Sequence, residues 1–447
     1  MKTLCRMICR VLCFGLVLGL FGCNTPPEEV VPTHGSTEPT ETTAAPTEVT
    51  ETTGATEPTI DPILAERRDA AEAYMRAMAT YLWRAEEDII YTRDSTVLTD
   101  EDLSAYKGSE TIKLKAGRLY RGVPDSNAGT SPWNFYDYAG EADEKGIHTV
   151  SGLHWRALNG GAAIGARVGN DCSAAVQLAW SSVGGKFKPS STQFMVQNRG
   201  FLKVGDYESD PEKYYKTTLT CTENGEQTMY DAYAQLQKAD AVVMRKDSYG
   251  HTMMVVDVNV VYKDDGTINA SRSNVTVLHQ TSSYIKAEKY TYDETLGENV
   301  YTTFGIDDKF TFSQLFMDGY LPVTCDALID PAPVEAVKIT DSEQVYTAEN
   351  ILTGVFTCNR IISGVGITIT DKAGNVVADA FCYYPRTSNV SEFTFDLAKR
   401  FEKELAEVRW GELDPAALTP GEYHCTHTLR DAHGTEYVVR DFDFTVS

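Results

Sequence analysis

One cysteine stands where a helix is expected to begin. In VGNDCSAAVQLAW (168–180), Cys172 follows Asp171, which can cap the first turn of a helix predicted over 172–184. Unsatisfied N–H groups and the helix dipole favour negative charge at such a position, so a thiol there ionises more easily. The backbone N–H of Cys172 could also stabilise an oxyanion. These features predict a nucleophile, with a buried thiol that only packs as the alternative.

A thiolate needs a general base, and two histidines on predicted strands can supply one. His251, in SYGHTMMVVDV, stands at the start of a strand, and His279 ends the strand VTVLHQ. If the two strands pair, His279 could hold the ring of His251 in the productive tautomer. Because a slip of one residue reverses the face of a strand, Gln280 is the alternative third member. For His251, the alternative is a hydrogen-bonded histidine of the core.

The elements that must position these residues read as helices followed by strands. An amphipathic helix is predicted over 61–90, with Asp61 as its cap and Pro62 at its first helical position. One more helix is expected over 227–237, and two strands are expected over 252–262 and 273–281. Residues 105–170 are expected to form a loop-rich stretch. This order of elements predicts an α+β domain.

After residue 330 the pattern changes to alternating apolar and polar residues. A strand is predicted over 365–371, three more strands with glycine turns between 418 and 446, and a short helix over 396–407. These elements predict an all-β sandwich of about a hundred residues. In its pattern this sandwich resembles the immunoglobulin-like accessory domains that follow bacterial surface enzymes.

Two histidines and a cysteine in HCTH (424–427) suggest a metal site at first sight. On a strand, however, His424 points to the opposite face from Cys425 and His427, because successive side chains alternate. No metal site is therefore predicted there.

The N-terminus has the features of an export signal. Residues 1–22 combine a basic start with an apolar stretch of 12 residues, too short to span a bilayer by itself. The stretch ends in LFGC, which resembles the lipobox of bacterial lipoproteins. That resemblance implies that Cys23 is diacylated and anchors the mature chain to the membrane. The alternative is an ordinary cleaved signal. Residues 24–60, rich in Thr, Glu and Pro, should form a disordered tether.

The net charge of −24 argues against a nucleic-acid partner, because an acidic surface repels phosphate backbones. Five cysteines follow Cys23 when Cys172 is set aside, so they cannot all pair internally. Their wide spacing is not that of a disulfide scaffold.

Four segments, in order along the chain, resemble the NlpC-type papain-like cell-wall cysteine peptidases. NDCSAAVQLAW is similar to that family's DCSG-(L/F)-VQ, KADAVV (238–243) to PGD-(L/A)-V, GHTMMVVDV to HVGIYVG, and VTVLHQTSS to MIHAS. RLYRGVP (118–124) is similar to an upstream Y-x-x-GG, and KPSSTQF (188–194) is weakly similar to PRTSxxQ. Ala174 and Ala239 replace glycines of the family pattern.

The resemblance implies a papain-like fold with Cys172 as nucleophile, His251 as base and His279 as third member. It also implies hydrolysis of amide bonds in peptidoglycan stem peptides, with no metal or organic cofactor. Acyl transfer to an amine would use the same groups.

Three residues are further candidates for substrate contact. The resemblance would make Tyr120 a substrate-side or oxyanion-side group, with a core aromatic as the alternative. Asp171 and Ser173 flank the predicted nucleophile, although Asp171 is most simply a helix cap.

These features predict a lipid-anchored protein on the outer face of a bacterial membrane. Its parts would be a signal peptide (1–22), an anchor and tether (23–60), an NlpC-type papain-like domain (61–330) and an immunoglobulin-like sandwich (331–447). The predicted function is that of a cell-wall cysteine hydrolase. The alternative is a non-catalytic surface protein that binds glycan, peptide or a protein partner.

Overall fold

The structure, a computed structural model, describes residues 61–92, 111–126, 131–151, 169–187, 191–341, 346, 351, 355–383, 395–396 and 418–447. The predicted signal peptide, Cys23 and the tether lie outside the described residues. So does the helix predicted over 396–407, except for its first residue. Within the described ranges, no helix is both long enough and apolar enough to cross a bilayer.

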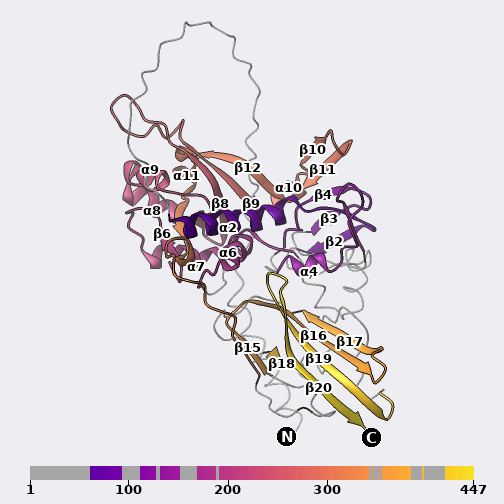
Figure 1. The fold of residues 1–447 in the computed structure, drawn as a ribbon. Helices are drawn as coiled ribbons and strands as arrows, with labels where there is room; N and C mark the ends of the chain where they lie inside the picture. Colours follow the sequence, from indigo (N-terminus) through magenta and orange to yellow (C-terminus); the bar gives the residue numbers. More distant parts are fainter. Residues whose placement is uncertain are drawn as a thin grey trace, which may run out of the picture.

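A long helix opens the described chain. α2 (Pro62–Thr80) begins at Asp61, whose side chain accepts a hydrogen bond from Ile63 N, so the predicted cap is confirmed. The helix contacts β9, β12 and α6 and crosses in front of the main sheet (Figure 1). Its predicted end at residue 90 is wrong, because the chain leaves helical geometry at Tyr81. The aromatic and β-branched residues that follow favour strands instead.

The main sheet has six strands in the order β12, β9, β8, β7, β13, β6, and each neighbouring pair is antiparallel. In chain order they are β6 (Leu202–Lys203), β7 (Ala241–Lys246), β8 (Tyr249–Asn259), β9 (Asn274–Gln280), β12 (Phe304–Thr311) and β13 (Leu321–Thr324). The strands predicted over 252–262 and 273–281 are thus confirmed as β8 and β9, with shifted ends.

Helices pack around this sheet. α6 (Cys172–Ser182) contacts β8 and β9, and it matches the helix predicted over 172–184. The helix predicted over 227–237 is α9 (Glu226–Ala234). The others are α7 (Thr192–Val196), α8 (Thr217–Asn224), α10 (Ser282–Lys286) and α11 (Phe312–Asp318), with the 3-10 turns η1 (Pro211–Lys213) and η2 (Asp326–Leu328).

A second sheet has the strand order β10, β11, β4, β1, β5, and β2 pairs separately with β3. These strands are β1 (Leu82–Ala85), β2 (Ile89–Thr92), β3 (Thr111–Leu114), β4 (Leu119–Arg121), β5 (His148–Val150), β10 (Tyr290–Asp293) and β11 (Glu298–Thr302). The short helix α4 (Trp133–Tyr136) lies in the same part of the chain. Short elements among loops, as predicted for 105–170, are therefore present in its described residues.

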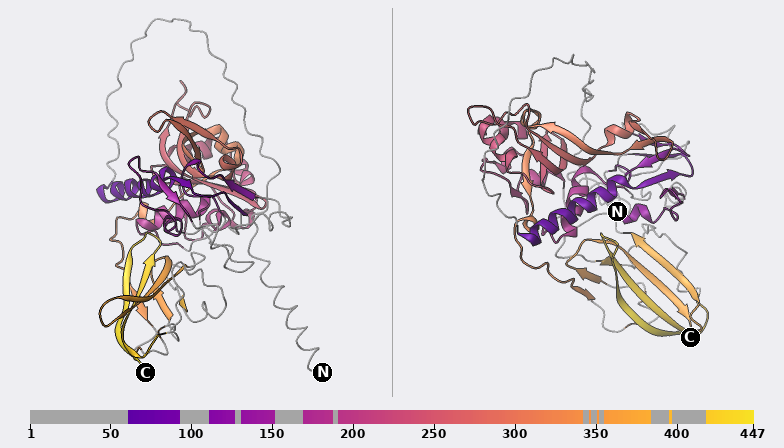
Figure 2. Two further views of the ribbon diagram at one scale, coloured as in Figure 1. Left: turned by 90° about the vertical axis from the view of Figure 1, so that its right-hand side faces the viewer. Right: turned by 45° about the horizontal axis from the view of Figure 1, so that its top comes forward.

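The described residues from 339 onward form strands, turns and loops (Figure 2). A four-stranded sheet has the order β17, β16, β19, β20, and a three-stranded sheet has the order β14, β15, β18. The strands are β14 (Ile339–Asp341), β15 (Val355–Cys358), β16 (Ile362–Asp371), β17 (Val376–Tyr383), β18 (Phe395–Asp396), β19 (Gly421–Asp431) and β20 (Glu436–Val446). The prediction of three strands after residue 418 is wrong: two long strands form there, joined by one turn.

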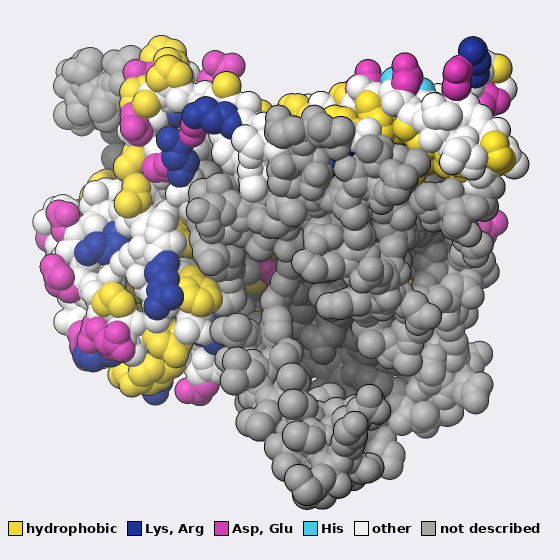
Figure 3. All heavy atoms as spheres, turned by 90° about the horizontal axis from the view of Figure 1, so that it is seen from below, with side chains coloured by type: hydrophobic (Ala, Val, Ile, Leu, Met, Phe, Trp, Pro, Cys, Tyr) yellow, Lys and Arg dark blue, Asp and Glu magenta, His cyan; other side chains and the backbone are white. Residues whose placement is uncertain are grey.

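Each half of the described chain has its own apolar core. The larger core includes Trp83, Trp180 and Val277, and the smaller one includes Val365 and Leu429. On the face seen from below, acidic and basic side chains of the described part are interspersed among apolar ones (Figure 3). Exposed ion pairs contribute only about 0–1 kcal/mol each, so the two cores dominate stability.

The turn between β19 and β20 lies against the first half of the chain. Ala432 O accepts a hydrogen bond from Tyr74 OH of α2 at 3.2 Å. His433 Nε2 lies 3.0 Å from Ser181 Oγ, in the last turn of α6. The two halves are therefore joined by specific polar contacts.

A buried ion pair reinforces this junction. Arg430 of β19 donates to both carboxylate oxygens of Asp137, at 2.9 and 2.7 Å. Both side chains are at most one-tenth exposed. Removing one partner would leave the other charge buried without compensation.

Candidate active site

Cys172 is the first residue of α6, as predicted. Asp171 has an extended backbone and caps the helix: its Oδ1 accepts hydrogen bonds from Ser173 N and Ala174 N, both at 2.9 Å. The same oxygen accepts a hydrogen bond from Ser173 Oγ at 2.7 Å. Asp171 therefore acts as a cap here, and the Ser173 hydroxyl, nearly buried, is held by that cap.

Cys172 also differs from the other cysteines in its exposure. It is half-buried, whereas Cys221, Cys325, Cys358 and Cys425 are buried. Burial raises the pKa of the thiols of Cys221, Cys325 and Cys425 to about 12 and also raises that of Cys358. Among these five, Cys172 is the thiol that a soluble reagent or substrate can reach.

The two predicted histidines are in direct contact. His251 Nε2 lies 2.8 Å from His279 Nδ1, and both side chains are buried. Strands β8 and β9 pair with Met254 opposite Leu278. Continuing that register puts Met253 opposite His279, so His251 is its diagonal neighbour on the same face. The predicted pairing of the two strands thus brings the rings together.

A carboxylate extends this pair. His279 Nε2 lies 3.1 Å from Asp308 Oδ2 of β12, and the Tyr284 hydroxyl of α10 donates to the same oxygen. Burial alone would raise the pKa of Asp308, but the hydrogen bonds from His279 and Tyr284 outweigh it and hold that pKa below its ordinary value. Asp308 is therefore an ionised group at the end of a chain that begins at His251.

The sequence interpretation missed Asp308 because its face depends on a β-bulge. In β12, Gly305 pairs with His279 and Ile306 with Leu278, but the next pair is Asp308 with Val277. Asp307 is the extra residue, and it has a positive φ of 57°. In a regular strand Asp308 would share the face of Ile306, because side chains alternate. The bulge moves it to the face of His279.

Gly305 leaves the space in which this contact forms. A Cβ atom at this position would overlap both His279 Nε2 and Asp308 Oδ2. A glycine opposite a histidine, followed by two adjacent aspartates in a strand, is the sequence signal that could have identified the group.

Gln280, the alternative third member, is not in contact with His251. Its Nε2 donates to Val123 O at 2.8 Å, on the other face of β9. Its buried Oε1 has no hydrogen-bond partner among the described residues. The one-residue register question is thus resolved geometrically: His279 is the residue that contacts His251.

The hydrogen bond from Gln280 leads to the residues that precede Cys172. Val123, which it binds, begins a short segment that pairs with the residues before Cys172: Ser126 N donates to Asn170 O at 2.8 Å and Asn170 N to Pro124 O at 3.0 Å. This segment therefore joins the end of β9, next to His279, to the N-terminus of α6.

The other end of α6 is anchored too. Trp180 Nε1 donates to Ala239 O at 2.6 Å, and Ala239 N donates to Val255 O of β8 at 2.8 Å. The eight residues from Trp180 back to Cys172 rise about 12 Å in a helix. The four residues from Val255 back to His251 span about 14 Å in a strand. The two anchors together place Cys172 at the end of β8 that carries His251.

Ala239 occupies a position suited to glycine. Its φ is +67°, in the left-handed region that favours residues without a Cβ atom. Asp240, which follows it, is buried and forms an ion pair with Arg68 of α2 at 2.9 Å. Its carboxylate therefore ties α2 to the start of β7.

Tyr120 lies in the core. Its ring stacks on Trp83 with centroids 4.9 Å apart, and its hydroxyl accepts a hydrogen bond from Lys115 N at 2.6 Å. It is about 1% exposed, so the core alternative describes it better than substrate contact.

The HCTH segment is arranged as predicted from strand alternation. His424 is partly exposed and lies 2.7 Å from Asp441 and 2.8 Å from Asp443. Cys425 and His427 are buried on the opposite face. Burial lowers the pKa of His427 to about 4, and its Nε2 lies 2.7 Å from Ile351 O. These are core contacts of the smaller core.

Comparison with known proteins does not assign the chain to a family. No family model matches it. No curated protein matches it either. One solved structure, a tetra-tandem repeat in the extending region of a large adhesion protein, is 14% identical, with a TM-score of 0.17. The match covers 46% of this chain and 41% of that one, and a likeness at this TM-score carries no argument about fold or function.

Proposed function

We propose that this chain is a cysteine hydrolase that cleaves amide bonds in peptidoglycan stem peptides. The observation that carries the proposal is the chain of contacts from His251 through His279 to Asp308, at the end of the sheet where α6 begins with Cys172. In this proposal the first half of the chain is a papain-like, NlpC-type domain and the second half an immunoglobulin-like sandwich.

The contacts dictate the tautomers of both rings. An ionised Asp308 accepts, so His279 Nε2 must carry its proton and donate. With both rings neutral, His279 Nδ1 is an acceptor, and His251 Nε2 donates to it. This leaves the lone pair of His251 on Nδ1, which becomes the basic nitrogen.

The reaction follows from these groups. His251 Nδ1 takes the proton of the Cys172 thiol, and the thiolate attacks the amide carbonyl carbon, forming a C–S bond. The resulting imidazolium, stabilised by His279 and Asp308, protonates the leaving amine as the C–N bond breaks. Water, deprotonated by His251, then attacks the thioester. The C–S bond breaks, the carboxylic acid leaves and the thiol is restored.

The substrate class rests on sequence. The ordered segments around Cys172, His251 and His279 resemble those of wall peptidases, and the signal and LFGC residues support export and lipid anchoring at Cys23. A chain held on the outer face of a bacterial membrane would meet peptidoglycan there.

The test is digestion of purified peptidoglycan from several wall chemotypes by the full chain, with fragments identified by mass spectrometry. We expect cleaved stem peptides, and none with Cys172→Ala or His251→Ala. Unchanged muropeptides in every chemotype would overturn the wall-peptidase proposal. If iodoacetamide also labelled Cys172 no faster than an ordinary thiol, the chain would instead be a binding protein.

A further inference from the structure

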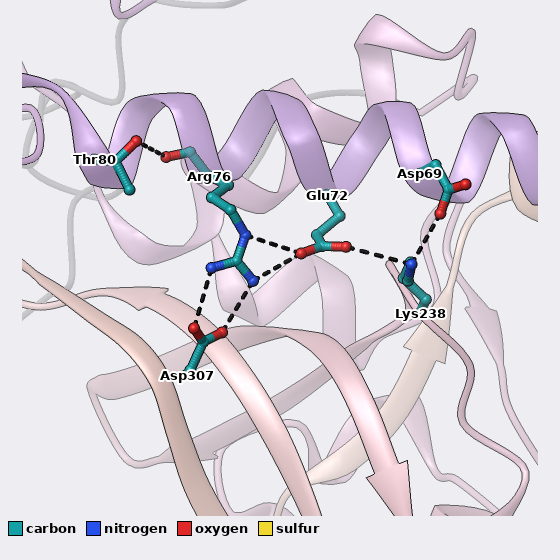
Figure 4. A network of polar contacts seen from close by, with 6 residues as sticks. All are labelled: Asp69, Glu72, Arg76, Thr80, Lys238 and Asp307. Atoms are coloured by element: carbon teal, nitrogen blue, oxygen red, sulfur yellow. Dashed lines mark hydrogen bonds and ion pairs between the residues drawn. The ribbon is translucent and has the colours of Figure 1, made fainter.

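The bulge that orients Asp308 is held from outside the sheet. Arg76 of α2 binds Asp307 with both terminal nitrogens, Nη1 to Oδ2 at 3.2 Å and Nη2 to Oδ1 at 2.9 Å (Figure 4). Its Nε and Nη2 also donate to Glu72 Oε1, one helical turn earlier, at 2.9 and 2.7 Å. These contacts raise the pKa of Arg76, chiefly through Asp307, so the guanidinium is permanently charged.

The helix that carries Arg76 is itself fixed to the sheet. Glu72 Oε2 lies 3.6 Å from Lys238 Nζ, which also contacts Asp69 at 2.9 Å (Figure 4). The buried pair of Arg68 with Asp240 ties α2 to β7. Arg76 is therefore a fixed point against which the side chain of Asp307 is held.

The backbone of Asp307 needs such support. Its φ of +57° is unfavourable for a residue with a Cβ atom, although aspartate tolerates it better than most. If the bulge slid or closed, alternation along β12 would turn Asp308 away from His279. The two neighbouring aspartates thus bind on different sides: Asp307 binds Arg76 of α2, and Asp308 binds His279.

We propose that Arg76 is a positioning residue for the active site: by binding Asp307 it holds the β12 bulge, and through the bulge it keeps Asp308 against His279. This inference rests on the proposed function. It assigns to α2 a role in the ionisation of Cys172 without contact to any reacting atom.

The experiment measures the rate of alkylation of Cys172 by iodoacetamide between pH 5 and 10 in the full chain, with the labelled peptide identified by mass spectrometry. The variants are Arg76→Ala, Asp307→Gly and the double variant. Glycine takes a positive φ without strain, so Asp307→Gly retains the bulge but removes the carboxylate that Arg76 binds. Lys213→Met is the control, since it removes an exposed ion pair with Glu223 on α8 that plays no part in holding α2 or the bulge.

For Arg76→Ala, we expect alkylation of Cys172 at pH 7 to slow roughly three- to tenfold, the effect of losing a partly exposed bidentate ion pair. The midpoint of the pH profile should move upward. In the Asp307→Gly background the same substitution should have no further effect, and Lys213→Met should keep the wild-type profile. A simple loss of stability would not produce this pattern, because the pH dependence of alkylation measures the ionisation of the Cys172 thiol in the folded chain.

Two results would overturn the inference. A wild-type profile in Arg76→Ala, or an equal loss when Arg76→Ala is added to Asp307→Gly, would show that Arg76 does not act through the bulge, while the proposed function stands. An ordinary thiol profile in the wild-type chain would instead refute the proposed function and this inference with it.

Discussion

His251 Nε2 and His279 Nδ1 lie 2.8 Å apart, in a buried contact that only one pair of tautomers satisfies when both rings are neutral and Asp308 is ionised. The contact assigns separate tasks to the two nitrogens of His251: Nε2 holds the ring and Nδ1 is left as the base. The proposed chemistry depends on this division.

Replacing His279 should therefore affect reactivity, whereas replacing Gln280 should affect stability. For His279→Ala we expect hydrolysis and Cys172 alkylation at pH 7 to fall roughly 100-fold, the low end of what a positioned acid–base system contributes. Gln280→Met, which loses the hydrogen bond to Val123, should cost about 1 kcal/mol in the free energy of unfolding. Alkylation kinetics and urea unfolding of both variants check this. Slower alkylation in Gln280→Met but not in His279→Ala would contradict this prediction.

Gly305→Ala should break the contact between His279 and Asp308, because the new Cβ atom overlaps the bonded atoms of both. We expect a loss of about 1–3 kcal/mol in stability from overpacking, together with slower alkylation of Cys172. Gly140→Ala is the control, since its Cβ atom would meet its nearest neighbour, Thr149 O, at 3.6 Å. Equal reactivity of Cys172 in the two variants would count against a role for the contact between His279 and Asp308.

The carboxylate of Asp308 should make stability depend on pH. Its folded pKa lies below its ordinary value of 3.8, because the hydrogen bonds from His279 and Tyr284 outweigh its partial burial. A depressed folded pKa stabilises the fold at pH values above the unfolded pKa, and this contribution is lost as the pH falls through the folded pKa. Asp308→Asn should thus unfold more easily than wild type at pH 7. The difference in melting temperature should shrink as the pH is lowered below about 4. A constant difference would contradict this.

The ion pair at the junction of the two halves should be far more important than one at the surface. Asp137→Ala removes the carboxylate that is paired with the buried Arg430, so we expect a loss of about 3–5 kcal/mol in the free energy of unfolding. Arg121→Met removes the more exposed pair with Asp293 and should cost much less. Urea unfolding measures both. Similar losses would show that the junction is open to water.

Much of the candidate site could be predicted from the sequence because its signals are local. A capping aspartate before an apolar helix located Cys172, and two alternating strands located His251 and His279. The helix over 61–90 was predicted ten residues too long because its amphipathic pattern runs into strand-forming residues without a break. Two strands rather than three form after residue 418: of the two glycines there, Gly434 lies in the turn, whereas Gly421 is the first residue of β19.

The rest depends on tertiary register. Whether His279 or Gln280 meets His251 is set by the pairing of β8 with β9, and the face of Asp308 is set by a bulge that alternation alone cannot predict. Tyr120 could be placed in the core only when its stacking on Trp83 was known.

The polar contact between Ser181 and His433 has a mechanical consequence. One end of α6 is fastened to the C-terminal sheets, and the other end carries the sulfur of Cys172. A helix of 11 residues acts as a stiff rod about 16 Å long, so a load that tilts the C-terminal half would be delivered to the thiol. Movement of the C-terminal half would thereby reach Cys172 along α6, against the resistance of the Trp180–Ala239 hydrogen bond that ties the same end of the helix to the main sheet.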